Sequence, residues 1–115
     1  MQISVVIPAL NEESNLRLLL PRLHRVVSAL TSEEYEIVVV DGGSTDDTVE
    51  VVRSLEARVV TQEEPGYGGA LKAGFQASSG DYVLTLDADL SHDPDFIDRM
   101  WKARREAEIV VASRY

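Results

Sequence analysis

Five short apolar runs alternate along the chain with longer stretches in which apolar residues recur every three or four positions. The runs are rich in β-branched residues and end at prolines, glycines or charged residues, so we interpret them as buried strands. They cover residues 3–7, 37–40, 59–60, 82–86 and 109–112. Strands that alternate with helices at this spacing predict right-handed βαβ units, and hence an α/β fold whose mostly parallel sheet carries helices on both faces.

The first helical stretch is the longest one. Its apolar residues recur at helical spacing from Leu16 to Leu30, which predicts a single buried stripe. Pro21 lies within this stretch. Because proline lacks a backbone N–H, we expect a kink there, or a restart of the helix with Pro21 in its first turn.

Local signals mark the starts of the later helices. Ser44 and Asp47 resemble a capping box, with aspartate in place of the usual glutamate or glutamine. The apolar stripe of that second helix would contain Val49, Val52 and Leu55. A glycine loop over residues 66–69 leads into a third helix over 70–77. The predicted buried face of the fourth helix comprises Phe96, Ile97, Met100 and Trp101.

Polar or glycine-rich segments follow each predicted strand. In an open parallel sheet, ligands bind beyond the carboxyl ends of the strands. The segments at those ends are residues 8–13, 41–44, 66–69, 87–89 and 113–115. We therefore expect a ligand site built from acidic and glycine-rich segments, with one arginine, at one edge of the sheet.

Asp87 and Asp89 are the strongest chemical signal in the sequence. Two like charges one residue apart repel each other unless water screens them or a cation lies between them. A turn at the end of a strand can direct both carboxylates at one ion. Hard oxygen ligands suit Mg²⁺ or Mn²⁺, and such sites commonly share the metal with substrate phosphates. We interpret the pair as a site for a divalent metal.

Other polar residues have plainer interpretations. Asp47 and Asp93 are expected to cap helices, the latter before a proline at the first helical position. His24 is expected at the surface or in packing. Lys72 lies just inside the third predicted helix, where it would either meet a phosphate together with backbone N–H groups or be a solvated surface lysine. Both interpretations of Lys72 stay open.

Composition limits the class of protein. With 115 residues, of which 44% are apolar, we expect one globular domain over residues 1–115. The formal charge of −9 argues against a nucleic-acid partner. Cysteine is absent, which excludes disulfides and thiolate metal sites. The N-terminus shows no signal-peptide pattern and no apolar run approaches the roughly 20 residues that span a bilayer, so we expect a soluble, cytoplasmic chain.

Five ordered motifs resemble a known family. They are residues 7–13 (IPALNEE), 40–46 (VDGGSTD), 66–74 (GYGGALKAG), 86–90 (LDADL) and 113–115 (SRY). Together they make the chain similar to glycosyltransferase family 2, in particular its dolichol-phosphate mannosyltransferase-like branch. The resemblance implies the Rossmann-like A-type glycosyltransferase fold. It also implies metal-dependent, inverting transfer of a hexose of mannose or glucose type from a nucleotide sugar, such as GDP-mannose or UDP-glucose, to an acceptor, most simply polyprenyl phosphate at the membrane surface.

The resemblance implies roles for particular residues. Those expected to bind the donor nucleotide are Pro8, Ala9, Asn11, Glu12, Glu13, Asp41, Gly66, Lys72, Asp87 and Ala88. Asp87, Asp89 and Ser91 would hold Mg²⁺ or Mn²⁺ on the diphosphate. Asp89 and Arg114 would act catalytically, by stabilising the charge that builds on the leaving phosphate. No general base can be named, which favours an acceptor oxygen that is already anionic.

The chain departs from the family pattern in three places. Many relatives carry two adjacent acidic residues after the second strand, whereas Gly42 occupies the second position here. Glutamine often stands where this chain has Ser91, a shorter ligand with a single oxygen. Family domains continue well beyond residues 113–115, so the chain resembles the N-terminal, donor-binding half alone. An exposed sheet edge would then favour self-association, and a longer parent protein would act at the cytoplasmic face of the membrane.

Three interpretations from other classes stay open. A haloacid-dehalogenase-type phosphatase also has Asp-x-Asp at a strand end, although on its first strand. A Ca²⁺-binding loop would use an EF-hand register, but His92 stands where that loop requires glycine. Its ligands would be Asp87, Asp89, Ser91, Asp93 and Asp98. The chain would otherwise be a nucleotide-binding module without turnover.

Overall fold

The protein is described by a computed structural model that covers residues 1–89, 96–102 and 109–111. Its strands form one five-stranded sheet in the order β3-β2-β1-β4-β5, and every neighbouring pair is parallel. The strands are β1 (Ile3–Ala9), β2 (Tyr35–Asp41), β3 (Arg58–Thr61), β4 (Tyr82–Thr85) and β5 (Ile109–Val111). The helices are α1 (Glu13–Leu30), α2 (Thr48–Ser54), α3 (Gly66–Ala77) and α4 (Phe96–Lys102). The predicted parallel α/β fold is confirmed.

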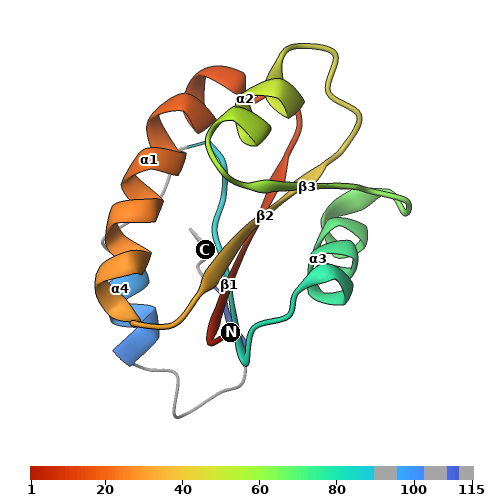
Figure 1. Cartoon of the computed structure of the whole chain (residues 1–115). Coiled ribbons are helices and arrows are strands. Elements are labelled where there is room, and N and C mark those ends of the chain that lie inside the picture. Colours follow the sequence, from red (N-terminus) through yellow and green to blue (C-terminus); the bar gives the residue numbers. More distant parts are fainter. Residues whose placement is uncertain (90–95, 103–108, 112–115) are drawn as a thin grey trace.

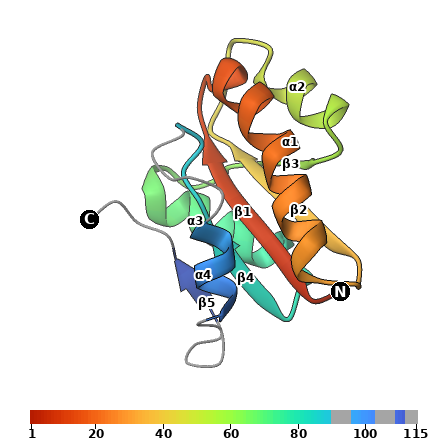
Figure 2. The same ribbon diagram turned by 90° about the vertical axis from the view of Figure 1, so that its left-hand side faces the viewer.

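Helices cover both faces of the sheet, as predicted. Figures 1 and 2 show α1, α2 and α4 on one face and α3 alone on the other. Two separate groups of buried residues correspond to these two layers, the larger one under α1, α2 and α4 and the smaller one under α3. The order of the strands reverses beside β1, because β2 and β3 lie to one side of it and β4 and β5 to the other.

The central strands are buried on both faces, which explains their continuous apolar runs. In β1, Val5 and Ile7 belong to the larger core, whereas Val6 belongs to the smaller one with Ala70 of α3. Successive side chains of a strand point to opposite faces, so one run of valines and isoleucines supplies both layers. The continuous apolar run of β1 thus agrees with its position in the middle of the sheet.

Helix α1 runs without a break through Pro21, so the predicted restart is wrong. Proline in a helix interior costs about 3 kcal/mol. Against this cost, each fully buried leucine contributes roughly 1.5–3 kcal/mol. The buried residues of α1 are Leu16, Leu19, Leu20, Leu23 and Val27. Burial of this stripe against the sheet outweighs the cost of the proline.

Three local predictions about the later helices are corrected. Helix α2 begins at Thr48, and Asp47 occupies its N-cap position without a side-chain cap hydrogen bond, so the predicted capping box is absent from this part of the chain. Val51, and not Val49, is buried beside Val52. Phe96 of the last described helix is 41% exposed, so it does not belong to the buried face that Ile97 and Trp101 form.

The glycines predicted as a loop are the first turn of α3, which already begins at Gly66. Gly66 has a φ of 84°, a conformation that glycine adopts without strain. Gly69 lies close to the chain entering the helix, because a Cβ there would clash with the carbonyl oxygen of Glu64. The glycines thus let the β3–α3 connection turn directly into the helix.

His24 packs as expected. Its ring nitrogens lie 2.7 Å from the hydroxyl of Tyr35 and 2.8 Å from the carbonyl oxygen of Leu55, which joins α1 to β2 and to the end of α2.

In the part of the chain that is described, no helix is long and apolar enough to cross a membrane.

Candidate functional site

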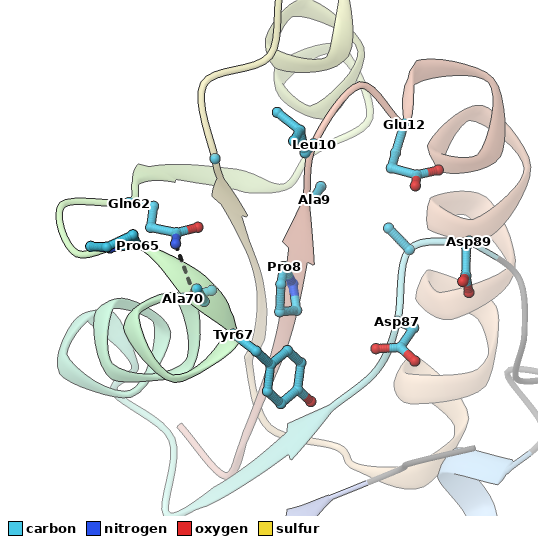
Figure 3. A pocket seen from close by; sticks show the side chains of 13 residues that line it. Pro8, Ala9, Leu10, Glu12, Gln62, Pro65, Tyr67, Ala70, Asp87 and Asp89 are labelled. Carbon is cyan, nitrogen blue, oxygen red and sulfur yellow. Dashed lines mark hydrogen bonds between the residues drawn. The ribbon is translucent and has the colours of Figure 1, made fainter. Parts of the chain in front are cut away.

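A cavity of about 530 Å³ opens at the carboxyl edge of the sheet, where the fold predicts a ligand site. Segments from four elements form its walls: the end of β1, the turn after β2, the connection from β3 into α3, and the segment after β4 (Figure 3). Its lining residues are Pro8, Ala9, Leu10, Glu12, Gly42, Gln62, Pro65, Gly66, Tyr67, Ala70, Asp87, Ala88 and Asp89.

The β1–α1 segment, residues 8–12, is held against the β2–α2 turn by reciprocal hydrogen bonds. The backbone N–H of Asn11 donates to the hydroxyl of Ser44 at 2.9 Å. In return, the side-chain oxygen of Asn11 accepts from the backbone N–H of Thr45 at 2.8 Å. Asn11 has a φ of 54°, in the left-handed region that asparagine tolerates. Asn11 therefore shapes the wall of the cavity without lining it.

The amino end of α1 is capped by side chains of the same β2–α2 turn. The N–H of Glu12 donates to the hydroxyl of Thr48 at 3.0 Å, and the N–H of Glu13 donates to Asp46 at 3.4 Å. These two N–H groups are among the donors that a helix amino end would otherwise offer to an anion. Protein side chains already occupy both of them, so neither is free to bind a phosphate.

Asp46 is expected to make folding stability depend on acidity. The side-chain hydrogen bond from Thr48, with smaller help from backbone N–H groups, lowers the pKa of the Asp46 carboxyl below its ordinary 3.8. A lowered pKa means stability that is fully present above pH 4 and is lost as the pH falls through the folded-state pKa. Between about pH 5 and pH 3, the Tm of the natural chain should therefore fall by more than the Tm of Asp46→Asn. Equal losses in both chains would show that this carboxylate does not stabilise the turn.

The side chain of Asp41, at the end of β2, forms hydrogen bonds within its own turn. It is only 8% exposed, and its carboxylate accepts hydrogen bonds from the backbone N–H groups of Gly43 and Ser44 at 3.2–3.3 Å. Its side chain does not line the cavity. The structure thus gives Asp41 a role in shaping the turn, a role that aspartate commonly has.

The acidic pair lines the cavity together with the β1–α1 segment. Asp87 and Asp89 follow β4, and Figure 3 shows both side chains on the side of the cavity opposite Gln62. Ala88 between them is only 4% exposed. The N–H of Leu86 donates to the carbonyl oxygen of Val6 at 3.1 Å, which attaches the start of this segment to β1. Two carboxylates that begin on a rigid strand end can be held near one ion.

The donor set of this pair fits Mg²⁺ or Mn²⁺. Both Asp87 and Asp89 supply hard oxygens, the ligands that these ions prefer. Within the described ranges no group of three or more histidine, cysteine or acidic side chains could hold a metal. An ion at the pair would therefore take its remaining oxygens from water and a bound diphosphate, as Mg²⁺ usually does.

The structure brings together seven of the residues predicted for the site. They are Pro8, Ala9, Glu12, Gly66, Asp87, Ala88 and Asp89. Asn11, Glu13 and Asp41 do not line the cavity, and their hydrogen bonds lie within and between the β1–α1 and β2–α2 connections. Lys72 does not line this cavity: its ammonium group lies 2.8 Å from the carboxylate of Glu64, and it lines a different cavity between β3 and α3. Ser91 and Arg114 lie outside the described residues.

Six lining residues were not predicted individually. Leu10, Gly42 and Tyr67 lie within segments expected at the site, whereas Gln62, Pro65 and Ala70 lie outside them. A signal was available for Gln62, which directly follows β3 and so lies at a carboxyl strand end. Tyr67 also had one, because it is a lone aromatic residue between glycines and is 52% exposed. Both signals depend on where β3 ends and α3 begins.

The fold and the position of the cavity define the class of protein. A doubly wound parallel sheet with a cavity beside the reversal of its strand order is the architecture of nucleotide-binding α/β proteins. The chain belongs to glycosyl transferase family 2, because the profile of that family matches residues 4–115. The family resemblance predicted from the five motifs is confirmed.

Relatives with known names resemble the chain over nearly its whole length. It is 36% identical to dolichol-phosphate mannosyltransferase of Pyrococcus furiosus, over 100% of this chain and 34% of that protein. It is 37% identical to undecaprenyl-phosphate 4-deoxy-4-formamido-L-arabinose transferase of Aeromonas hydrophila, over 96% of this chain and 36% of that protein. The chain thus spans about a third of the length of these relatives.

Solved structures confirm the A-type fold. Glucosyl-3-phosphoglycerate synthase of Mycobacterium tuberculosis matches with a TM-score of 0.74 and 38% identity, over 86% of this chain and 39% of that one. The same enzyme in complex with Mn²⁺, UDP and glucosyl-3-phosphoglycerate matches with a TM-score of 0.70 and 37% identity, over 86% of this chain and 38% of that one.

The Ca²⁺-binding and phosphatase interpretations of the acidic pair lose support. In the EF-hand register Asp98 would be the last ligand, but it lies within α4 and pairs with Lys102 at 2.8 Å. A strand, β4, precedes the acidic pair where an EF-hand has a helix. A phosphatase of the haloacid type would carry the pair on its first strand, whereas here it follows the fourth.

Proposed function

We propose that this chain is the donor-binding part of a metal-dependent, inverting glycosyltransferase that moves a hexose of mannose or glucose type from a nucleotide sugar to polyprenyl phosphate. One observation carries the proposal. Asp87 and Asp89, at the end of β4, line a single cavity together with the β1–α1 segment. This arrangement provides one wall for a nucleoside and another for a metal-bound diphosphate.

The names of relatives support the choice of substrates. Two of them are transferases named for dolichol phosphate and undecaprenyl phosphate, which are both polyprenyl phosphates. The solved synthase was crystallised with Mn²⁺ and UDP, and in another crystal with Mg²⁺ and UDP. The proposed cofactor is accordingly Mg²⁺ or Mn²⁺. The proposed place of action is the cytoplasmic face of a membrane, where a polyprenyl phosphate presents its head group.

The chemistry needs charge stabilisation more than proton transfer. A divalent ion, when bound, neutralises the charge that develops on the leaving diphosphate. Asp87 and Asp89 would hold that ion, while Pro8, Ala9 and Glu12 would orient the nucleoside beside it. A phosphate acceptor carries an anionic oxygen, so the chain needs no general base to activate it. Arg114 would add positive charge near the phosphates.

Calorimetric titration tests the donor site. The chain is titrated with GDP-mannose, UDP-glucose, GDP and UDP, each with Mn²⁺ and with EDTA. We expect binding that requires Mn²⁺ and that is strong for one nucleotide. Binding of that nucleotide sugar without transfer to a polyprenyl phosphate would favour the nucleotide-binding module without turnover. Absence of binding to all four ligands would contradict the proposed donor site.

A further inference from the structure

Gln62 lies at the junction of two cavity walls. It follows the last residue of β3, and its backbone N–H donates to the carbonyl oxygen of Asp41 at 2.9 Å, so it continues the pairing between β2 and β3. Its side chain lines the cavity opposite the acidic pair (Figure 3). The position of this side chain is therefore set by the edge of the sheet.

The orientation of the Gln62 amide is fixed by its partners. Its Nε2 group donates to the carbonyl oxygen of Glu64 at 2.7 Å and to that of Gly66 at 2.9 Å. Both partners are carbonyl oxygens, which accept hydrogen bonds and cannot donate them. A flipped amide would place oxygen against oxygen at both contacts. Both N–H donors of the side chain are thus used inside the protein.

The amide oxygen consequently points into the cavity. Figure 3 shows Oε1 of Gln62 directed toward Pro8 and Ala9. A Cβ built on Gly42 would lie 3.4 Å from this oxygen, so Oε1 borders the space beside Gly42. Among the described residues, none donates a hydrogen bond to Oε1. Asp41 does not line the cavity, and its carboxylate accepts from two backbone N–H groups of its own turn.

We propose that Oε1 of Gln62 accepts a hydrogen bond from a ring N–H of the nucleobase and selects uracil or guanine against cytosine and adenine. The inference rests on the proposed function. The diphosphate belongs beside Asp87 and Asp89, and Gln62 lies on the opposite side of the cavity, where the base would extend. Uracil and guanine carry a ring N–H on their pairing edge, whereas cytosine and adenine carry an acceptor at that ring position. Two facing acceptors repel each other and leave a desolvated oxygen without a partner.

This assignment explains how the chain manages without a second acidic residue at position 42. Glycine there leaves the space open, and the amide of Gln62 supplies a neutral acceptor beside it. Gly42 is not in the left-handed region, and the contacts of an added Cβ would be 3.4–3.8 Å, which is ordinary van der Waals distance. Position 42 therefore has room for a Cβ, and an aspartate there is expected to offer an alternative acceptor.

Methylated ligands test the hydrogen bond with the natural chain intact. Calorimetry in Mn²⁺ compares UDP with N3-methyl-UDP, GDP with N1-methyl-GDP, and both parents with CDP and ADP. We expect UDP or GDP to bind, and its methylated form and both CDP and ADP to bind about 10-fold or more weakly. If UDP or GDP binds with Mn²⁺ but methylation and base identity change nothing, Gln62 does not read the base, and only this inference is overturned. If no nucleotide binds with Mn²⁺, the proposed donor site itself is wrong.

Two variants locate the effect at Gln62. In Gln62→Leu, methylation of the ligand should cost less than about 3-fold, while the affinity for Mn²⁺-pyrophosphate stays that of the natural chain. Adding Gly42→Asp to Gln62→Leu should restore discrimination against the methylated ligand. A Gln62→Leu chain that still discriminates 10-fold would overturn the inference. If that variant does not fold, as circular dichroism would show, the comparison of ligands on the natural chain decides alone.

Discussion

Replacing Asp89 by alanine is expected to abolish metal-dependent nucleotide binding, with the Kd for UDP or GDP in Mn²⁺ rising by about 100-fold or more to the value measured in EDTA. Asp87→Ala should do the same. Asp87 and Asp89 are the two cavity carboxylates proposed to hold the ion, so loss of either one leaves a single proposed protein ligand. Calorimetry with and without Mn²⁺ measures the change.

Asp81 provides the matched control for these variants. It is an exposed aspartate that directly precedes β4, whereas the acidic pair follows the same strand. Asp81→Ala removes an equal charge from the opposite end of β4, so it should leave nucleotide affinity unchanged. Neither Asp89→Ala nor Asp81→Ala should lower the Tm by more than a few degrees, since exposed charges contribute little to folding. Unchanged affinity in Asp89→Ala, with and without Mn²⁺, would remove the acidic pair from the site.

Glu36→Ala is expected to lower folding stability and leave nucleotide binding intact, the reverse of Asp89→Ala. We expect a loss of about 2–4 kcal/mol in the free energy of unfolding and little change in nucleotide affinity. Glu36 is 13% exposed, near the amino end of β2. Its carboxylate accepts from the hydroxyl of Ser4 and the N–H of Ser79, both at 2.6 Å, and lies 3.3 Å from Arg58. Its removal leaves the donors of Ser4 and Ser79 without their shared acceptor and loosens three strands.

Urea unfolding measures the effect, and Glu34→Ala is the control. Glu34 lies just before β2 and is exposed, so its removal should change stability by less than about 0.5 kcal/mol. Nucleotide binding by folded Glu36→Ala should persist, because Glu36 is at the end of the strands opposite the cavity. A variant as stable as the natural chain would show that the Glu36 hydrogen bonds contribute nothing net. Loss of nucleotide binding in a Glu36→Ala chain that stays folded would contradict the prediction that Glu36, at one end of the strands, does not affect the cavity at the other end.

The sheet and its functional edge could be predicted from sequence because both depend on strong local patterns. Continuous runs such as residues 37–40 mark strands buried on two faces, and the rule for parallel sheets then places every following segment at one edge. Asp87 and Asp89 were accessible to this reasoning because their spacing is informative without any knowledge of tertiary contacts. The cavity that the structure reveals lies at that predicted edge.

The remaining features depend on contacts between distant residues. Asp46 caps the amino end of α1 from 33 positions away, and no local pattern reveals that partnership. Both interpretations of Lys72 stay open on sequence alone, because its ion pair with Glu64, eight positions earlier, shows in no local pattern. Gln62 gained its importance only when its two carbonyl partners fixed the direction of its oxygen.

Paramagnetic broadening of backbone amide signals by Mn²⁺ tests the central claim most directly. The ¹⁵N-labelled chain is saturated with UDP or GDP, and substoichiometric Mn²⁺ is added, with Mg²⁺ as the diamagnetic control. We predict that the amide signals of Glu12, Asp87 and Asp89 broaden first, whereas those of Glu36 and Ser79 at the opposite end of the sheet stay sharp. Broadening centred elsewhere, or spread evenly over the chain, would contradict a metal-bound nucleotide at the end of β4.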